Sequence, residues 1–336
     1  MGEFFSKINS FFGWETPADE LVRISFPGLG IGEFEVNKIA IPLGENGIRW
    51  YGIIITLGMI VAVTYAIWRA KQKGNNTDDL IDMALYTILL GVIGARLYYV
   101  IFNGNVRSFY DVIAIWDGGL AIYGGIIGGV LGIFLVCKFK KLHFFSLLDC
   151  IGPGVMIAQA MGRWGNFFNG EAYGGIIAEG SPFYFLRMGL LPNSFGREMA
   201  YVHPTFLYES LWNVVGFVLM NVFYKKKKFD GEGALWYFGW YGLGRMAIEG
   251  LRQDSLMFFD LFRVSQVLAA VCVVASVTLI VVGRVKCAKK EKAGVAAVEA
   301  TDEIEETVES VESQECAQQN VEETNTEKES QNGEDH

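Results

Sequence analysis

The stretch from Gly162 to Gly174 holds the densest group of chemically capable side chains in the sequence. It reads GRWGNFFNGEAYG, with one arginine, two asparagines and one glutamate among its glycines. Glycine permits tight turns and leaves backbone N–H groups accessible, and a guanidinium group binds phosphate through two parallel hydrogen bonds. This composition indicates an anion-binding segment in which Arg163, Asn166 and Glu171 are the candidate polar contacts.

Other polar side chains interrupt apolar segments elsewhere in the chain. They are Tyr51, Arg96, Tyr123, His203, Glu209, Arg245 and Glu249. A charge inside a membrane span costs about 2.5–3.5 kcal/mol, so it indicates either a functional site or a structural ion pair. The structural alternative is that three arginines only pair with three glutamates to hold helices together. Those residues are Arg96, Arg163 and Arg245 with Glu171, Glu209 and Glu249.

Long apolar segments must position these groups. A helix of about 20 mostly apolar residues spans a bilayer, and seven segments fit that description, four of them interrupted by ionisable residues. They are 51–68, 80–101, 118–136, 144–161, 204–224, 233–250 and 264–283. The sequence therefore predicts an all-α polytopic membrane protein with about seven transmembrane helices.

Clusters of lysine and arginine predict the orientation of these helices. The clusters lie at 69–73, 138–141, 225–228 and 284–290, after the first, third, fifth and seventh segments. Because such loops stay in the cytoplasm, we expect the N-terminus outside and the C-terminus inside. With a rise of about 1.5 Å per residue, the polar groups named above then lie near the outer leaflet.

The net charge of −9 conceals two different parts of the chain. Residues 291–336 carry fifteen acidic residues and two lysines, whereas the rest has a net charge of +4. We therefore divide the chain into an extracytoplasmic arm at 1–48, a membrane catalytic domain at 49–290 with an outside loop at 162–203, and an acidic tail at 291–336. The tail composition predicts a disordered cytoplasmic segment whose partner is unknown. Aromatic residues within 4–12 predict a short interfacial helix.

Several function classes are disfavoured by composition. The five cysteines lack the spacing of a zinc site or a disulfide scaffold. The basic residues occur in short clusters between apolar segments, which is not the footprint of a nucleic-acid-binding protein. We expect no cofactor and no metal.

Five stretches, in order, resemble the prolipoprotein diacylglyceryl transferases of bacterial membranes. The stretch 162–174 is similar to the family's signature, and four more agree in order and spacing. Those four are 49–52, 94–97, 203–209 and 244–252. The resemblance runs from about residue 45 to 285. It departs from the family at Tyr123, where members often have a histidine that is assigned an important role.

The resemblance implies a group transfer at the outer leaflet of the bacterial cell membrane. A diacylglyceryl group passes from phosphatidylglycerol to the lipobox cysteine thiol of a prolipoprotein signal peptide. A thioether forms and glycerol phosphate leaves, as the first step of lipoprotein maturation. The implied catalytic residues are Arg163, Arg245, Tyr123 and His203. The implied substrate-binding residues are Arg163, Asn166, Glu171, Gly174, Tyr51, Arg96 and Glu249.

This reaction needs a thiolate nucleophile and cations that stabilise the leaving phosphate. Arg163 and Arg245 are the candidates for the phosphate. Either Tyr123 takes the role of the usual histidine or the base lies elsewhere, and His203 is the one histidine at the right depth. His203 has a structural alternative as a residue that caps the segment before Pro204.

Three other functions stay open from the residues alone. A carrier or flippase for an anionic lipid or solute would use the same arginines without chemistry, but it predicts polar groups at the midplane or on both sides. A membrane hydrolase or protease needs a Ser–His–Asp set or paired aspartates in its spans, which Asp149 alone does not provide. A receptor or scaffold would recruit partners through its tail and is compatible with enzymatic activity.

Overall fold

The computed structural model describes residues 20–42, 47–103, 108–115, 118–192, 196, 198–251, 257–258, 262–263 and 265–293. The predicted interfacial helix at 4–12 and the acidic tail beyond 293 lie outside these residues. Met1–Ile280 forms one compact unit and Val281–His336 another. All the contacts discussed below belong to the first unit.

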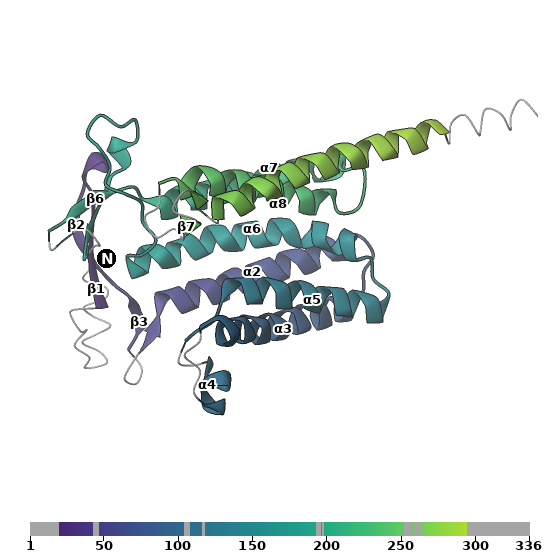
Figure 1. The fold of residues 1–336 in the computed structure, drawn as a ribbon, viewed down its shortest axis with the longest axis horizontal. Helices are drawn as coiled ribbons and strands as arrows, with labels where there is room; N and C mark the ends of the chain where they lie inside the picture. The colour runs from purple at the N-terminus through teal and green to yellow at the C-terminus, as the bar shows by residue number, and fades with distance from the viewer. Residues whose placement is uncertain are drawn as a thin grey trace, which may run out of the picture. The chain divides into compact units, whose positions relative to one another are not determined.

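Most of the described residues are helical (Figure 1). The long helices are α2 (Trp50–Lys71), α3 (Thr77–Asn103), α5 (Ile122–Lys140), α6 (Phe144–Asn169), α7 (Thr205–Phe223), α8 (Glu232–Glu249) and the helix Ser265–Ala293. The short α4 (Phe109–Ile113) follows α3, and 3-10 turns occur at Pro27–Leu29, Tyr184–Leu186 and Tyr224–Lys226. Each predicted span therefore corresponds to a helix.

Six of these helices, counted over the described residues, are long and apolar enough to cross a membrane. They are all the long helices except α8. Helix α8 carries Glu232, Arg245 and Glu249, which make it less apolar than the others. A mostly helical, multi-pass membrane protein is confirmed. That α8, the sixth long helix in chain order, also spans the membrane and brings the total to seven stays a prediction.

Glycine brings α3 and α5 into close contact. The backbone of Gly124 lies against that of Gly94, and a Cβ atom on Gly128 would collide with the carbonyl of Leu90. Small residues at helix contacts are typical of membrane bundles, where close backbone approach supplies the packing energy. The glycines that follow Tyr123 therefore serve helix packing.

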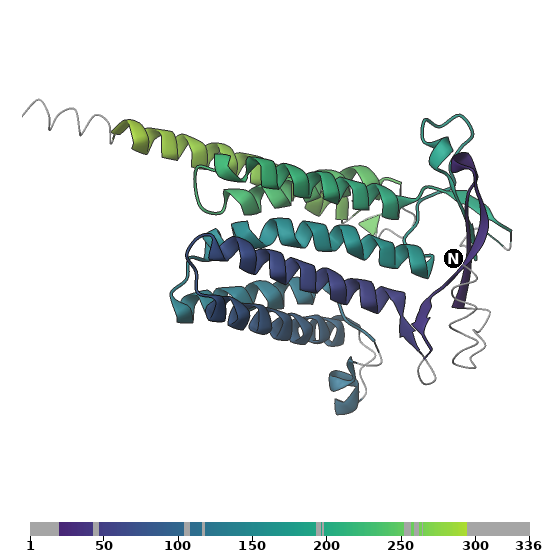
Figure 2. The ribbon, with the colours of Figure 1, turned by 180° about the vertical axis from the view of Figure 1, so that it is seen from behind.

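Helix α6 is the centre of the other part of the bundle and packs against α2, α7 and α8 (Figures 1 and 2). Helices α7 and α8 also contact each other through Trp212 and Trp240, whose rings stack with centroids 4.3 Å apart. Each indole N–H donates to the other tryptophan's backbone carbonyl at 3.0 Å. These contacts fix the three helices that carry most of the candidate site.

A four-stranded antiparallel sheet lies at one end of the helices, among the described residues. Its strands are β1 (Leu21–Phe26), β2 (Ile31–Asn37), β5 (Met188–Leu191) and β6 (Ala200–Val202), in the order β2-β1-β5-β6. Two hairpins pair β3 (Ile39–Ile41) with β4 (Ile48–Arg49) and β7 (Met257–Phe258) with β8 (Phe262–Arg263). The all-α expectation did not include these strands, and the four-stranded sheet joins the predicted outside arm to the predicted outside loop.

The sheet anchors the loops that follow α6 and precede α7. In β1 the side chains of Val22, Ile24 and Phe26 are buried on one face, as expected for a strand with period-two alternation. They form a common core with Phe167 at the end of α6 and Phe206 at the start of α7. This core holds the predicted anion-binding segment against the helices.

Candidate functional site

Four charged side chains from α6, α7 and α8 form a connected network, called the arginine cluster below. Arg163 Nη2 lies 2.5 Å from Glu209 Oε2, and Arg245 Nη1 lies 3.6 Å from the same oxygen. Arg245 Nη2 also lies 2.8 Å from Glu249 Oε2. Both glutamates are buried, whereas the arginine side chains are 20% and 21% exposed. Two guanidinium groups thus meet at one buried carboxylate and remain accessible.

Asn166 and Glu171 support Arg163 from the end of α6. Arg163 Nη1 donates to Asn166 Oδ1 at 3.3 Å, since residues three apart share a helix face. The Asn166 amide donates in turn to Glu171 Oε1 at 3.1 Å, as does the amide of Asn169. Glu171 therefore acts on Arg163 through Asn166 and not as its direct ion-pair partner.

Gly174 joins this segment to His203, two residues before α7. Its backbone N–H donates to the carbonyl of His203 at 2.9 Å, and the N–H of His203 donates to Gly175 at 3.1 Å. A Cβ atom on Gly174 would lie 2.7 Å from His203 Cβ and 2.9 Å from the carbonyl oxygen of Leu251. No larger residue fits here without displacing the backbone, so the predicted importance of Gly174 has a steric cause.

The His203 imidazole is half-buried beside the ring of Tyr208. Nδ1 lies 3.4 Å from the Tyr208 hydroxyl oxygen. Burial lowers the pKa of His203 below its ordinary value because it disfavours the charged form. His203 is therefore mainly neutral at pH 7 and can accept a proton.

Tyr51 lies at the start of α2, against α6. A Cβ atom on Gly165 would be 2.7 Å from Tyr51 Cδ2, so the ring covers this glycine. The neighbouring Trp50 stacks on Phe168 with ring centroids 5.2 Å apart. Tyr51 is thereby placed beside the turn of α6 that carries Arg163.

Arg96 and Tyr123 lie on the α3–α5 pair and contact no member of the arginine cluster within the described residues. Arg96 is 8% exposed and donates to the backbone carbonyls of Asp111, Val112, Gly118 and Gly119. It therefore holds the segment between α3 and α5 in place. Tyr123 is 45% exposed, and its ring centroid lies 6.1 Å from that of Tyr98.

The arginine cluster is suited to binding an anion through directed hydrogen bonds. The formal charges of its two arginines and two glutamates cancel, so attraction must come from accessible N–H groups. The Nε atoms of Arg163 and Arg245 donate to no other group in the described part of the chain. In a low-dielectric setting such charge-assisted bonds to phosphate are strong.

Ser265 contacts the arginine cluster and was not predicted from the sequence as a site residue. Its hydroxyl donates to Glu249 Oε1 at 2.8 Å, which fixes the carboxylate that holds Arg245. A serine at the start of an apolar helix gives no signal of such a role. Within the described ranges, no group of three or more His, Cys, Asp and Glu side chains is arranged to hold a metal ion.

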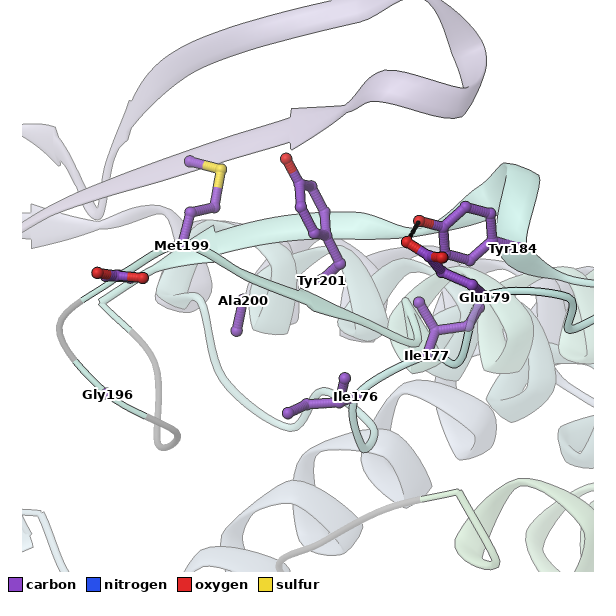
Figure 3. A pocket seen from close by; sticks show the side chains of 9 residues that line it. Ile176, Ile177, Glu179, Tyr184, Gly196, Met199, Ala200 and Tyr201 are labelled. Atoms are coloured by element: carbon purple, nitrogen blue, oxygen red, sulfur yellow. Dashed lines mark hydrogen bonds between the residues drawn. The ribbon is translucent and has the colours of Figure 1, made fainter.

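A hollow of about 710 Å³ lies on the sheet side of the molecule, bordered by strand β6 (Figure 3). It is lined by Ile176, Ile177, Glu179, Tyr184, Gly196, Glu198, Met199, Ala200 and Tyr201. The Tyr184 hydroxyl donates to Glu179 Oε1 across 3.4 Å, as the dashed line in Figure 3 shows. No residue of the arginine cluster lines this hollow.

Comparison with known proteins places the chain in a family. Residues 38–282 match the family model described as prolipoprotein diacylglyceryl transferase. The chain belongs to this family. The match includes every residue of the arginine cluster, together with Tyr51, Asn166, Glu171, Gly174 and His203, so the resemblance predicted from five stretches is confirmed.

Curated relatives agree over nearly their whole length. A phosphatidylglycerol–prolipoprotein diacylglyceryl transferase of Streptococcus mutans is 43% identical over 257 residues, covering 74% of this chain and 96% of the relative. Proteins of the same name from Streptococcus equi subsp. zooepidemicus and Listeria monocytogenes are 42% identical over 253 residues and 40% identical over 264 residues. Their matches cover 73% and 77% of this chain and 94% of each relative.

Proposed function

We propose that this chain transfers the diacylglyceryl group of phosphatidylglycerol to the lipobox cysteine of prolipoproteins, the first step of lipoprotein maturation. The observation that carries the proposal is that the family match coincides with the arginine cluster, in which Arg163 and Arg245 converge on Glu209. The names of the relatives contain both substrates, a lipid with a phosphate and a prolipoprotein.

The proposed enzyme crosses the bacterial plasma membrane seven times, with its N-terminus outside and its C-terminus in the cytoplasm. The sheet supports this topology, because β1 and β2 of the arm pair with β5 and β6 of the loop after α6. The arm and the loop must then lie on one side, and an even number of spans between them achieves this. The three domains predicted at 1–48, 49–290 and 291–336 fit the same arrangement.

Helix α8, the sixth long helix in chain order, can complete the set of seven spans because each of its charged side chains has a hydrogen-bond or ion-pair partner. Arg245 and Glu249 pair with each other within the arginine cluster. Glu232 is fully buried and accepts a hydrogen bond from the Lys228 backbone N–H at 2.6 Å. Charges that face the bundle interior in pairs are the ones that membrane helices tolerate.

In the proposed reaction, Arg163 and Arg245 bind the phosphate of the lipid at the outer leaflet. The cysteine thiolate attacks the glycerol carbon that carries the phosphate oxygen, so a C–S bond forms while the C–O bond breaks. The bonding electrons leave with glycerol phosphate, and the arginines stabilise the added charge. Asn166 and Glu171 position Arg163, and Glu249 positions Arg245.

We assign His203 as the proton acceptor in preference to Tyr123. His203 is tied by two backbone hydrogen bonds to the segment that carries Asn166 and Glu171, and its lowered pKa keeps it neutral at pH 7. Tyr123 stands on the separate α3–α5 pair. A neutral imidazole also accepts a proton at neutral pH more readily than a phenol does.

The direct test incubates the purified full-length protein with phosphatidylglycerol and a lipobox peptide, followed by mass measurement of the peptide. We expect the mass of one diacylglyceryl group to be added, and only when the peptide retains its cysteine. A matched peptide with serine at that position is the control. No adduct in the presence of intact lipid would contradict the transferase proposal, and an external reporter signal after Lys290 would contradict the topology.

A further inference from the structure

A second polar layer lies inward of the arginine cluster on the same three helices. Gln159 of α6 comes four residues before Arg163, and Asn213 of α7 comes four residues after Glu209. Since α6 and α7 run in opposite directions, both residues lie about one turn, roughly 5 Å, further from the sheet. Tyr237 of α8 joins them, because Gln159 Nε2 donates to its hydroxyl oxygen at 2.9 Å.

Two amide oxygens in this layer have no hydrogen-bond partner in the described part of the chain. Gln159 Oε1 and Asn213 Oδ1 are buried, and neither accepts a hydrogen bond from any described residue. The Asn213 side chain belongs to a residue that is only 3% exposed. A buried polar atom without a partner costs about 1–3 kcal/mol, so the two amides leave hydrogen-bonding capacity for a polar group that the described residues do not supply.

Asn213 is enclosed by helix contacts above and below it. Three residues earlier, the Ser210 hydroxyl donates to the carbonyl of Ala160 on α6 at 3.0 Å. Three residues later, Gly216 packs against Met156 of α6 and Trp240 of α8. The buried face of α7 that carries Asn213 therefore looks into the space between α6 and α8.

We propose that Gln159, Asn213 and Tyr237 form a binding site for the ester groups of the diacylglyceryl moiety. This inference rests on the proposed function. In a glycerophospholipid one ester group is on the glycerol carbon next to the phosphate-bearing carbon, and the other is on the carbon after it. When the arginines bind the phosphate of the lipid, the ester carbonyls of the same lipid lie further from the sheet by a distance comparable to one helical turn.

The hydrogen-bonding capacity of the layer matches this ligand. Ester carbonyls accept hydrogen bonds and cannot donate them. The Gln159 amide can turn by 180°, so that its NH₂ group takes the place of Oε1 and its oxygen accepts a hydrogen bond from the Tyr237 hydroxyl. The Asn213 amide can turn by 180° and present its NH₂ group where its oxygen now lies. The layer thus offers two donors to the two ester carbonyls of the lipid.

Ester recognition predicts a substrate preference that apolar packing alone would not give. A phosphatidylglycerol whose chains are ether-linked has the same charge and similar shape but no carbonyl. Bound in its place, it would leave the polar layer without partners, and such sites reject analogues that lack the hydrogen-bonding group. We expect each lost hydrogen bond to lower transfer by about three- to tenfold.

A competition between the two lipids tests the inference. The full-length protein is given equal amounts of diester and diether phosphatidylglycerol with a lipobox peptide, and the two peptide products are separated by mass. We expect the wild type to favour the diester and both Tyr237→Phe and Asn213→Leu to reduce that preference by about three- to tenfold. Tyr237→Phe removes only the hydroxyl, so it keeps the test decisive if Asn213→Leu fails to fold.

Asn221→Leu is the matched control on α7. Its side-chain oxygen is already bonded to Tyr65 and Arg69, at 2.6 and 2.5 Å, so its loss should leave the preference unchanged. Equal use of both lipids by the wild type would overturn the inference, as would a preference that Tyr237→Phe leaves intact. No product from either lipid would instead contradict the proposed transferase function.

Discussion

Buried carboxylates occur at both ends of the α6–α7–α8 group, and their surroundings differ. At the end away from the sheet, Asp149 of α6 is fully buried and pairs with Lys227 Nζ at 2.9 Å. Its two oxygens also accept from the backbone N–H groups of Gly231 and Ala234 at 3.0 Å each. Near the sheet, Glu209 instead receives two arginines that keep accessible N–H groups.

The difference separates a structural site from a binding site. Asp149 accepts from the first turn of α8, where a carboxylate is stabilised by unpaired N–H groups and the helix dipole. Lys227 is shared with Asp230 at 2.7 Å, and this hydrogen bond lowers the pKa of Asp230. Every polar atom of the Asp149 carboxylate is therefore used within the protein. The arginine cluster keeps donor capacity for a ligand.

The largest expected effect comes from Arg163→Ala. Removing one charge-assisted contact to a developing anion lowers a rate by about 10²–10³-fold, and we expect transfer to fall by that factor in the adduct assay. Arg187→Ala is the matched control, because Arg187 lies in the loop between α6 and α7, and its guanidinium carbon lies 4.2 Å from the centroid of the Tyr184 ring. A similar loss in both variants would show that the cluster has no special role.

His203→Gln should have the next largest effect, and its size should depend on pH. A thiol with a pKa of about 8.5 is only about 3% ionised at pH 7, so loss of the base costs at most roughly 30-fold. Above pH 9 the thiol ionises without help, and the deficit should disappear. The measurement is the rate of adduct formation from pH 5 to 9.5.

The transfer rate at low pH tests the direction of the His203 pKa shift. Because burial lowers its pKa, protonation should reduce wild-type activity only below the ordinary histidine value of about 6.5. The glutamine variant should instead decline from about pH 8.5 downward, because its rate follows the fraction of ionised thiol. Profiles that bend at the same pH in both enzymes would assign the acid-side group to the substrate or to another residue, and would contradict His203 as the base.

Asp149→Asn should affect stability and leave catalysis nearly intact. The substitution weakens the contact with Lys227, although Lys227 remains paired with Asp230. We therefore expect the free energy of unfolding to fall by about 1–3 kcal/mol and Tm by about 5 °C. Transfer per folded molecule should stay within about twofold. Asp82→Asn is the control, because Asp82 pairs with Lys140 on the surface, at 43% and 42% exposure. A large loss of transfer activity in folded Asp149→Asn would contradict the view that Asp149 is structural and that the arginine cluster is the binding site.

Hydropathy and charge were sufficient to predict the helices, because burial of apolar side chains in lipid depends mainly on segment composition. They did not predict the sheet. The stretch LVRISFPGLGIGEFEV has strand alternation around a Pro-Gly turn, but pairing of β1 with β5 joins residues far apart in the chain. The partners of two charged residues were also not predicted: Arg96 donates to backbone carbonyls, and, among the described residues, Glu171 is linked to Arg163 through Asn166.

The smallest expected effect tests whether position near the sheet end is enough to make a residue catalytic. Tyr123 is exposed, and its hydroxyl makes no hydrogen bond to the described residues. Tyr123→Phe should therefore keep transfer within about twofold. Tyr208→Phe, which removes the hydroxyl beside His203 Nδ1, should slow transfer by about threefold, the value of one uncharged hydrogen bond. If Tyr123→Phe instead abolished transfer while Tyr208→Phe did not, the proton acceptor would lie on α5, and the reactive site would extend from the arginine cluster to the α3–α5 pair.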